Sequence, residues 1–256
     1  MTALKIIGFL LVLAAAAGII IFSTKRVRGK YPAIFRKIPA ITRLKRAIGL
    51  SVEDGSRVHV ALGNADLTEA TNTSALVGLS ALHAIGQLSS NSDQPPICTS
   101  GDGGFTLLSK DVLRAAAVET NTRDNYNPDL GYLSGATPFS FALGAMDAIE
   151  DGGVKTNVLL GNFGVEAGLL AAHAEKHTSF TLAASDSIVA QAVFMATSRD
   201  VLIGEELYAV PAYLAYRPAH IASLRVQDIL RFLVGGALLL GALLKGRQRV
   251  ALKFAQ

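Results

Sequence analysis

Small and acidic residues follow each of six short apolar segments, and these are the residues of the chain that could hold a ligand. They are Gly63, Asn64, Asp66, Gly101, Asp102, Gly135, Gly161, Asn162, Gly164, Glu166, Asp186, Glu205 and Glu206. In an open α/β sheet the carboxyl ends of the strands line a ligand-binding crevice. Backbone amides at the helix N-termini beside it can bind an anion. The same residue types also turn a strand into a helix and cap it, so a binding and a structural interpretation both stand.

The acids of this set have two possible roles. Carboxylates gathered at one edge could hold Mg²⁺ or Ca²⁺ through oxygen ligands, which would suit a metal-dependent enzyme. Asp66, Glu166 and Asp186 also precede predicted helices, where a negative charge stabilises the helix dipole by about 0.3–1 kcal/mol. The adjacent Glu205 and Glu206 repel each other, so we expect them to bond a neighbouring backbone or a basic residue of another subunit. We assign no catalytic residue and no metal ligand from these patterns.

Nucleotide-binding motifs do not match. A dinucleotide fingerprint needs G-x-G-x-x-G directly after the first strand, but the first turn contains only Gly63. The turn from Gly161 to Gly164 lacks the third glycine, and no Gly-Lys-Ser/Thr triplet of a phosphate-binding loop occurs. The sequence therefore predicts no standard nucleotide cofactor.

The five histidines do not form a metal-binding pattern. His173 and His177 are four residues apart, but they lack the preceding Glu of a zincin and fall at a helix end, where cationic groups are favoured. His59 and the single cysteine, Cys98, could face each other on adjacent strands, although no acid is placed to orient the histidine. One cysteine allows neither an intrachain disulfide nor a cysteine zinc site.

Strands and helices must alternate to position these residues. The predicted strands cover 57–62, 96–99, 130–133, 157–160, 179–183 and 201–203, and the predicted helices cover 74–88, 109–118, 139–149, 165–176 and 188–196. Such alternation implies βαβ units and a parallel sheet. We predict a Rossmann-like α/β domain over residues 55–224, with a mostly parallel sheet, helices on both faces, and N- and C-terminal membrane helices flanking it.

The N-terminal segment predicts a membrane anchor. Residues 6–24 carry no charge, and nine basic residues follow before the first acid, Glu53. A bilayer core needs about 20 apolar helical residues, and flanking basic residues stay on the cytoplasmic side. We therefore expect an anchor at 1–24, basic amphipathic juxtamembrane helices at 25–54, with Pro39 dividing them, and a cytoplasmic domain at the inner (plasma) membrane. A cleaved signal peptide, cut near the alanines at 14–17, is the alternative.

A second apolar run, Phe232–Leu244, lies between Arg231 and Lys245. It predicts a second membrane helix at 225–246 followed by a basic tail at 247–256; a buried or interfacial helix is the alternative. The glycines Gly235, Gly236 and Gly241 give it a small-residue face suited to helix contacts in lipid.

The distribution of charge limits the partners. All 20 acids lie between residues 51 and 228 together with only nine Lys or Arg, whereas the other 15 basic residues lie in the two ends. A nucleic-acid-binding domain would carry the positive charge itself, so we expect no nucleic acid as partner. The basic ends suit anionic lipid headgroups, at about 1 kcal/mol per Lys or Arg.

Several sequence blocks carry a family resemblance. Residues 201–209 read Val-Leu-Ile-Gly-Glu-Glu-Leu-Tyr-Ala, and the related blocks are 36–40, 59–63, 161–166, 212–214 and 222–228. Together they resemble an uncharacterised family of bacterial membrane-anchored proteins. The resemblance implies an α/β domain between membrane helices and supplies no activity. Residues 45–49 are more basic than the corresponding family segment.

Three functions fit these patterns. The first is a scaffold that forms a homo-oligomer in a membrane assembly. Its contacts would be Leu207, Tyr208 and Tyr213 of the apolar 204–224 segment and the glycines of the second helix, although core packing would also explain the apolar segment. The second is a sensor that binds a small molecule in the strand-end crevice. The third is a metal-dependent enzyme, which the motifs support least.

Overall fold

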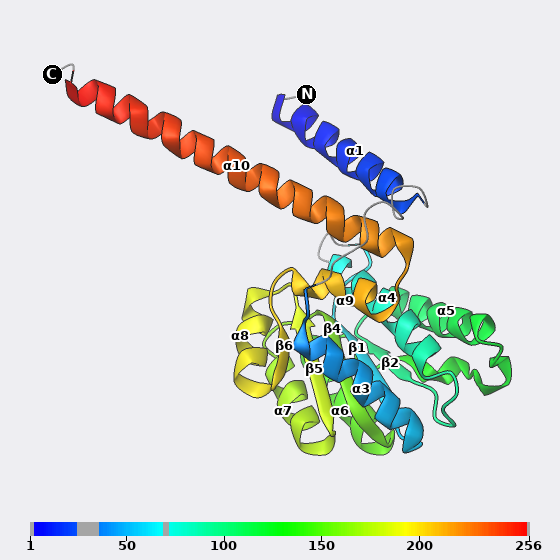
Figure 1. The fold of residues 1–256 in the computed structure, drawn as a ribbon. Coiled ribbons are helices and arrows are strands. Elements are labelled where there is room, and N and C mark those ends of the chain that lie inside the picture. Colours follow the sequence, from blue (N-terminus) through cyan, green and yellow to red (C-terminus); the bar gives the residue numbers. More distant parts are fainter. Residues whose placement is uncertain (1–2, 25–35, 69–71, 255–256) are drawn as a thin grey trace. The chain divides into compact units, whose positions relative to one another are not determined.

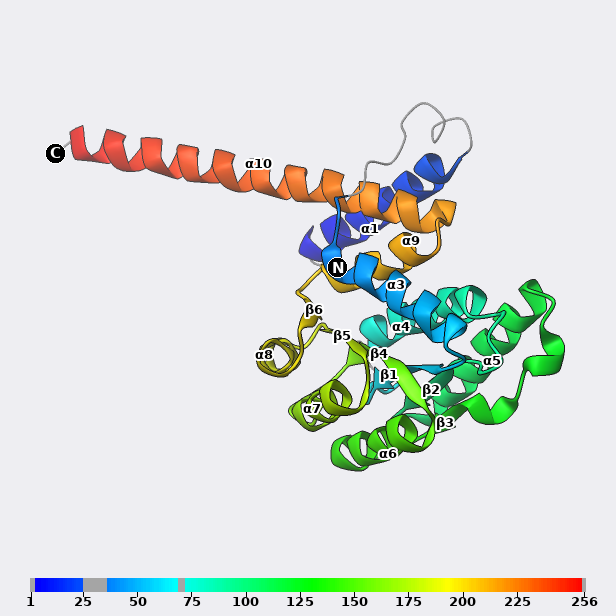
Figure 2. The same ribbon diagram turned by 60° about the horizontal axis from the view of Figure 1, so that its bottom comes forward.

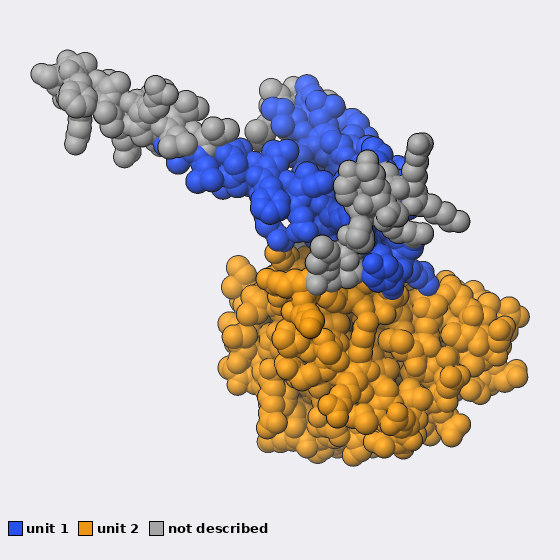
Figure 3. Space-filling view, viewed as in Figure 1, with its two compact units in different colours: residues 1–35, 216–256 blue, residues 36–215 orange. Residues whose placement is uncertain are grey.

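The computed structural model describes residues 3–24, 36–68 and 72–254, and it divides the chain into two compact units. One unit contains residues 36–215, and the other combines residues 1–35 with residues 216–256; Figure 3 colours them separately. Each unit is described below by itself.

A six-stranded, fully parallel sheet forms the centre of unit 36–215 (Figure 1). Its strands are β1 (Arg57–Gly63), β2 (Ile97–Ser100), β3 (Gly131–Leu133), β4 (Val154–Asn162), β5 (Phe180–Ser185) and β6 (Asp200–Leu202). They lie in the order β3-β2-β1-β4-β5-β6. This order is that of two mononucleotide-binding halves joined back to back, with the direction of winding reversed between β1 and β4. The predicted Rossmann-like sheet is confirmed.

Helices cover both faces of the sheet (Figure 2). The first face carries α3 (Pro39–Glu53), α4 (Thr73–Leu88) and α5 (Gly103–Glu119). The second carries α6 (Pro138–Asp151), α7 (Ala167–His177) and α8 (Ile188–Thr197). The short helix α9 (Glu206–Leu214) follows β6 and packs against α4 and α3. The helices after β1 and β2 thus share one face, and those after β3, β4 and β5 share the other.

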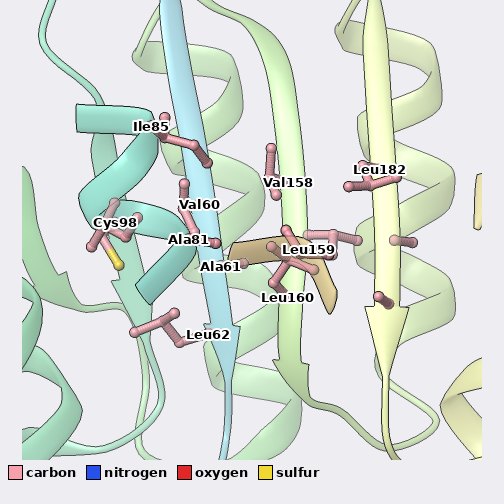
Figure 4. Packing of buried hydrophobic residues seen from close by; sticks show 14 of the residues in the cluster. Val60, Ala61, Leu62, Ala81, Ile85, Cys98, Val158, Leu159, Leu160 and Leu182 are labelled. Atoms are coloured by element: carbon pink, nitrogen blue, oxygen red, sulfur yellow. The ribbon is translucent and has the colours of Figure 1, made fainter. Parts of the chain in front are cut away.

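The core forms where apolar residues of the inner strands meet these helices. Val60 of β1 lies beneath Ala81 and Ile85 of α4, and Val158 of β4 stands beside them (Figure 4). All four side chains are fully buried. Because a buried parallel strand is covered on both faces, apolar residues occupy successive positions at 60–62 in β1 and at 158–160 in β4 instead of alternating ones.

Local sequence sets the helix ends. Thr137 and Ser140 form a capping box at the start of α6, and Pro138 occupies its first turn, where the missing N–H of proline costs nothing. Ser187 caps α8 by accepting a hydrogen bond from the Ala190 amide. After α6, Gly153 adopts φ +66°, a left-handed conformation that favours glycine, and the chain turns into β4.

The observed elements differ from the predicted ones in a few places. Pro39 begins α3, because proline is tolerated at a first helical position. The connection between α5 and β3 contains two short 3₁₀ turns, Arg123–Asn125 and Pro128–Leu130, so Leu130 lies outside the strand predicted for 130–133. Residues 25–35 of the predicted juxtamembrane helices lie outside the described residues.

The other unit contains two helices, α1 (Ala3–Ser23) and α10 (Pro218–Phe254). They are in contact, and a Cβ on Gly18 of α1 would lie 3.1 Å from a methyl group of Val226. Among the described residues, Lys5–Ser23 is the helix long and apolar enough to cross a membrane. The described part of α10 contains no stretch that meets the same standard, so the predicted second membrane helix is not shown. Helix α10 continues without a break across two predicted boundaries. One is the end of the α/β domain at residue 224, and the other is the end of the second membrane helix at residue 246.

Candidate functional site

The carboxyl edge of the sheet is the first place to look for a ligand, because its winding reverses between β1 and β4. Here the two strands stay together past their ends. The amide of Asn64 donates a 2.9 Å hydrogen bond to the carbonyl of Asn162, and Gly63 turns with φ +79°. In the same way, the Gly101 amide donates to the Gly63 carbonyl over 2.9 Å. Backbone bonds therefore tie the first residue after β1 to the last residue of β4, and the first residue after β2 to the last residue of β1.

The glycines predicted to approach a ligand approach protein atoms instead. A Cβ on Gly63 would lie 1.8 Å from the Asn162 carbonyl oxygen, and one on Gly161 would lie 1.8 Å from the Leu62 carbonyl oxygen. Gly101 fits closely against the Asn64 side chain. Gly135 packs likewise against the backbone of the first turn of α6, and Gly164 against the Glu166 carboxylate. Close approach within the chain accounts for glycine at all five positions.

Each described acid among the candidates, apart from the Glu205–Glu206 pair treated next, accepts a hydrogen bond from its own neighbourhood. Asp102 caps α5 by accepting from the Phe105 amide over 3.0 Å. The buried Glu166 accepts from the Gly164 amide over 2.6 Å. Asp66 accepts from the amide and hydroxyl of Thr68, and these bonds lower its pKa. Asp186 accepts from the Asn162 side chain over 3.3 Å. These contacts match the structural interpretation of the acids.

Glu206 finds its basic partner within the same chain. Its carboxylate pairs with Arg36 at 2.6 Å, and the Tyr213 hydroxyl donates to the Arg36 carbonyl over 2.6 Å. Arg36 and Ala215 are the first and last residues of this unit. Since Glu206 follows β6, these contacts hold the point where the chain enters the unit beside the point where it leaves, at the carboxyl edge.

Apolar side chains are exposed at this same edge. Of the sixteen exposed large apolar residues in the described part of unit 36–215, twelve lie at a strand's carboxyl end, in the turn after it, or in the first two turns of the next helix. They are Leu67, Leu76, Leu107, Leu108, Leu133, Phe139, Leu143, Val165, Leu169, Ile188, Val189 and Ile203. The other four, Leu50, Leu88, Val118 and Met195, lie in last turns of helices. We call the twelve the apolar edge.

Two grooves reach the opposite, amino edge, where charged residues line them. One has a volume of about 560 Å³ and runs along the outer strand β3, from Arg57 and Asp151 at the amino edge past Tyr132 to Leu133 and Ser134 at the carboxyl end of the strand. The other, about 430 Å³, lies near Asp200 at the start of β6. Burial raises the pKa of Tyr132, with a smaller contribution from the charges of Asp147 and Asp151. The phenol therefore stays neutral at physiological pH.

Three buried polar side chains are linked by hydrogen bonds across the middle of the sheet. His59 Nδ1 lies 2.7 Å from the Asn157 amide oxygen, and its Nε2 lies 2.8 Å from the Thr99 hydroxyl. All three side chains are fully buried, and burial lowers the pKa of His59 to about 4. The imidazole is consequently neutral and structural. The Asn157 amide nitrogen has no hydrogen-bond partner.

His59 and Cys98 do not face each other. Cys98 is the neighbour of Thr99 on β2, and side chains of successive strand residues point to opposite faces. The thiol therefore turns away from the imidazole towards α5, where it meets Ser109. Burial raises the pKa of Cys98 to about 12, so it is not a thiolate nucleophile.

Glu150, His173 and His177 form a cluster that the sequence analysis missed. Their ligand atoms all lie within 4.8 Å of one another. Glu150 ends α6, whereas both histidines belong to the end of α7. The i, i+4 spacing of the histidines was visible in the sequence, but only the packing of α6 against α7 brings the carboxylate to them.

The comparison with sequence families matches residues 2–254 to a domain of unknown function, DUF6754. The chain belongs to this family. No curated protein and no solved structure gave a match. The resemblance to an uncharacterised family is thereby confirmed. Because the family supplies no activity, a function for this DUF6754 chain can be argued only from its structure.

The predicted contact residues of this DUF6754 chain have different surroundings. Leu207 is fully buried in the core, and Tyr208 and Tyr213 are half-buried against it. Core packing therefore explains Leu207, and its side chain is not available to a second subunit. Along α10, a Cβ on Gly235, Gly236 or Gly241 would meet no atom within 4 Å. This small-residue face is open.

Proposed function

We propose that the chain is a membrane-anchored structural component in which α1 crosses the bilayer and the α/β domain lies on the cytoplasmic membrane surface with its apolar edge in the headgroup region. The domain would then serve as a scaffold held in a fixed orientation. The concentration of exposed apolar side chains at one edge of the sheet carries this proposal.

The attachment points support the orientation. Arg36 and Ala215, where the chain joins the segments leading to α1 and α10, both lie at the carboxyl edge, as the Arg36–Glu206 and Tyr213–Arg36 contacts require. Large exposed apolar patches mark protein or membrane interaction sites. A membrane surface fits the apolar edge because the chain also connects at this edge to the apolar 19-residue segment Lys5–Ser23.

Charge supports the cytoplasmic side. The segment 25–46 carries nine Lys or Arg and no acid, and basic segments next to a membrane helix remain on that side. Within the α/β unit, Arg36 and Lys37 lie at the point of entry, where anionic headgroups would attract them. The acidic groups of the amino edge would face the cytoplasm.

Spin labels on α8 test the orientation. Ile188 at its start and Met195 near its end have exposed fractions of 83% and 59%, and the native Cys98 is fully buried, so single labels can be placed at either position. The full chain would be reconstituted in vesicles that contain anionic lipid. We expect the label of Ile188→Cys to relax strongly with dissolved oxygen and weakly with a water-soluble nickel complex, and the label of Met195→Cys to show the reverse.

Two results would reject this orientation. Equal access of the nickel complex to both labels would show that the edge faces water. Protection of the Ile188→Cys label from oxygen as well as nickel would show that protein covers the edge instead of lipid.

We further propose that the scaffold is a homo-oligomer that associates through the open glycine face of α10. Close approach of helices in lipid favours such small residues. Replacing Gly235 and Gly236 by Leu should reduce crosslinking of the full chain in membranes, whereas Gly49→Leu on α3, also an open position, should leave it unchanged. A monomer at all protein-to-lipid ratios would refute self-association.

One observation favours a second candidate, a ligand sensor. The strand order places a winding reversal between β1 and β4, the position where such sheets bind ligands. A thermal-shift screen of dinucleotides, nucleotides and small anions tests it, because a ligand at 100 times its Kd stabilises the protein by about 2.7 kcal/mol. The close contacts of Gly63 and Gly161 with backbone lead us to rank it below the scaffold.

A further inference from the structure

The ends of α6 and α7 bring together two imidazoles and a carboxylate at the amino edge. Glu150 lies in the last turn of α6, and His173 and His177 lie one turn apart on α7. Residues at i and i+4 share one face of a helix, and the two helices pack against each other. The three side chains therefore converge from two elements at a position away from the apolar edge.

The distances suit one metal ion. The Nε2 atoms of His173 and His177 lie 3.2 and 3.7 Å from the Glu150 carboxylate oxygen Oε1. In a tetrahedral zinc site with bonds of 2.0–2.1 Å, neighbouring ligand atoms are about 3.3 Å apart. The imidazole rings are stacked with centroids 4.2 Å apart and an interplanar angle of 15°.

An unsatisfied atom marks the centre of the cluster. His173 Nε2 is buried and has no hydrogen-bond partner, because its approach to Glu150 lacks hydrogen-bond alignment. A buried polar atom without a partner destabilises the folded chain. A metal ion bound at this nitrogen would remove that cost.

The cluster is open to an incoming ion. The side chains of Glu150 and His177 are 50% and 44% exposed, whereas His173 is 12% exposed. Neutral imidazole is the form that binds metal, and the ligand atoms of all three side chains lie within 4.8 Å of one another. The charges that face the cluster are Asp147 of α6 and Lys176 of α7.

We propose that Glu150, His173 and His177 form a Zn²⁺ site that fastens the C-terminal end of α6 to that of α7. Two histidines and one carboxylate with a fourth position left for water are a known ligand set for zinc. Imidazole also suits Co²⁺, Ni²⁺ and Cu²⁺, which makes Co²⁺ a usable spectroscopic substitute. The site is independent of the membrane orientation proposed above.

The test uses the full chain in detergent, purified by a tag without histidines and treated with a chelator that is then removed. Titration with Co²⁺ should give the intense visible absorption of a tetrahedral site, and Zn²⁺ should abolish it at one equivalent per chain. Zn²⁺ should also raise the melting temperature. His177→Ala should weaken Zn²⁺ binding by at least about tenfold and remove the thermal shift.

The matched control is the pair His83–Glu119, whose nitrogen and oxygen atoms lie 3.4 Å apart but without a second histidine. His83→Ala should bind Zn²⁺ as the unaltered chain does. Because His173 is largely buried, Glu150→Gln serves as the second site variant; circular dichroism without metal shows whether each variant is folded. No Zn²⁺ binding by the unaltered chain, equal binding by a folded His177→Ala chain, or one ion per two chains would each overturn the proposal.

Discussion

At the carboxyl edge of the sheet, Val165, Ile188 and Ile203 expose at least half of their surface. At the amino edge, Asp151 ends α6, Lys155 lies at the start of β4, and Arg199 directly precedes β6. Both edges belong to the same six strands and to the same helices. The difference teaches that one sheet can offer two chemically distinct surfaces, of which the apolar one is the candidate interaction surface.

The edges also differ in how tightly the backbone is packed. Strand ends at the carboxyl edge are joined by bonds such as Asn64 to Asn162 and permit only glycine at positions 63 and 161. At the amino edge, the side chains of Arg43 and Asp200 join two elements, as those of Arg36 and Glu206 do at the carboxyl edge. Side-chain pairs therefore occur at both edges, whereas the close backbone contacts at Gly63 and Gly161 lie at the carboxyl edge.

The largest expected effect is that of Gly161→Ala. The added Cβ would lie 1.8 Å from the Leu62 carbonyl oxygen, and neither backbone can move away without separating β1 from β4. We expect a loss of about 3 kcal/mol or more, measured by urea unfolding of the full chain in detergent. Gly49→Ala is the control: its Cβ meets nothing within 4 Å in the exposed part of α3, and it should stabilise by about 0.5–1 kcal/mol. Equal effects would refute the tight packing of the carboxyl edge.

Acid should destabilise the centre of the sheet, midway between the edges. Burial lowers the pKa of His59 from 6.5 to about 4, so the unfolded chain binds this proton more readily than the folded one. Its contribution to stability is therefore complete above about pH 6.5 and is lost as the pH falls towards 4. At about 1.4 kcal/mol per pH unit, the loss approaches 3 kcal/mol.

This loss can be measured by urea unfolding at pH 7 and pH 4.5. In a folded His59→Gln chain, most of the difference between the two pH values should disappear, although the variant is less stable throughout. An unchanged pH dependence would show that other groups, such as His173, cause it.

Two ion pairs, one at each edge, allow the stabilities that they contribute to be compared directly. Arg43 pairs with Asp200, whose side chain is only 10% exposed, whereas Arg36 pairs with Glu206 while remaining 78% exposed. Arg43→Ala leaves a mostly buried carboxylate unpaired, so we expect a loss of about 1–2 kcal/mol. Arg36→Ala should cost less than about 0.5 kcal/mol, as exposed pairs do. Thermal unfolding at low and high salt measures both, and a larger loss for Arg36→Ala would reverse the comparison.

The smallest expected change in stability comes from lysine on the surface of α8. Ile188→Lys and Met195→Lys should each alter the unfolding free energy by less than about 0.5 kcal/mol, because both side chains are exposed. On vesicles the two should differ. Hydrogen exchange of the amides after β4, β5 and β6 should accelerate in Ile188→Lys and stay unchanged in Met195→Lys. The same exchange rates in both variants would argue against lipid at the apolar edge.

Much of the fold could be predicted because its signals are local. The apolar run of β1 and the Gly-Asn turn after it specify a strand without reference to distant residues. The Thr-Pro pair at the start of α6 specifies the beginning of a helix in the same way. The strand order could not be predicted in this way, since pairing of β1 with β4 joins residues about a hundred positions apart.

The sites were harder to predict because they depend on burial and on packing between elements. Leu207 and Ile188 look alike in the sequence, yet one is fully buried and the other is 83% exposed. Glu150 is separated from His173 by a strand and a turn, so no spacing rule connects them. The glycines at positions 63 and 161 suggested a ligand, whereas the atoms that they accommodate belong to neighbouring strands.

The contact between Tyr213 and the Arg36 carbonyl has a mechanical consequence. Because the two ends of the α/β unit are held side by side, tension applied through the flanking helices would pass across this short bridge and the Arg36–Glu206 pair before it reached any strand. The load would peel these few bonds apart one after another instead of shearing the sheet. Under force, the contacts of Arg36 with Tyr213 and Glu206 would break first, while the strands of the sheet stayed paired.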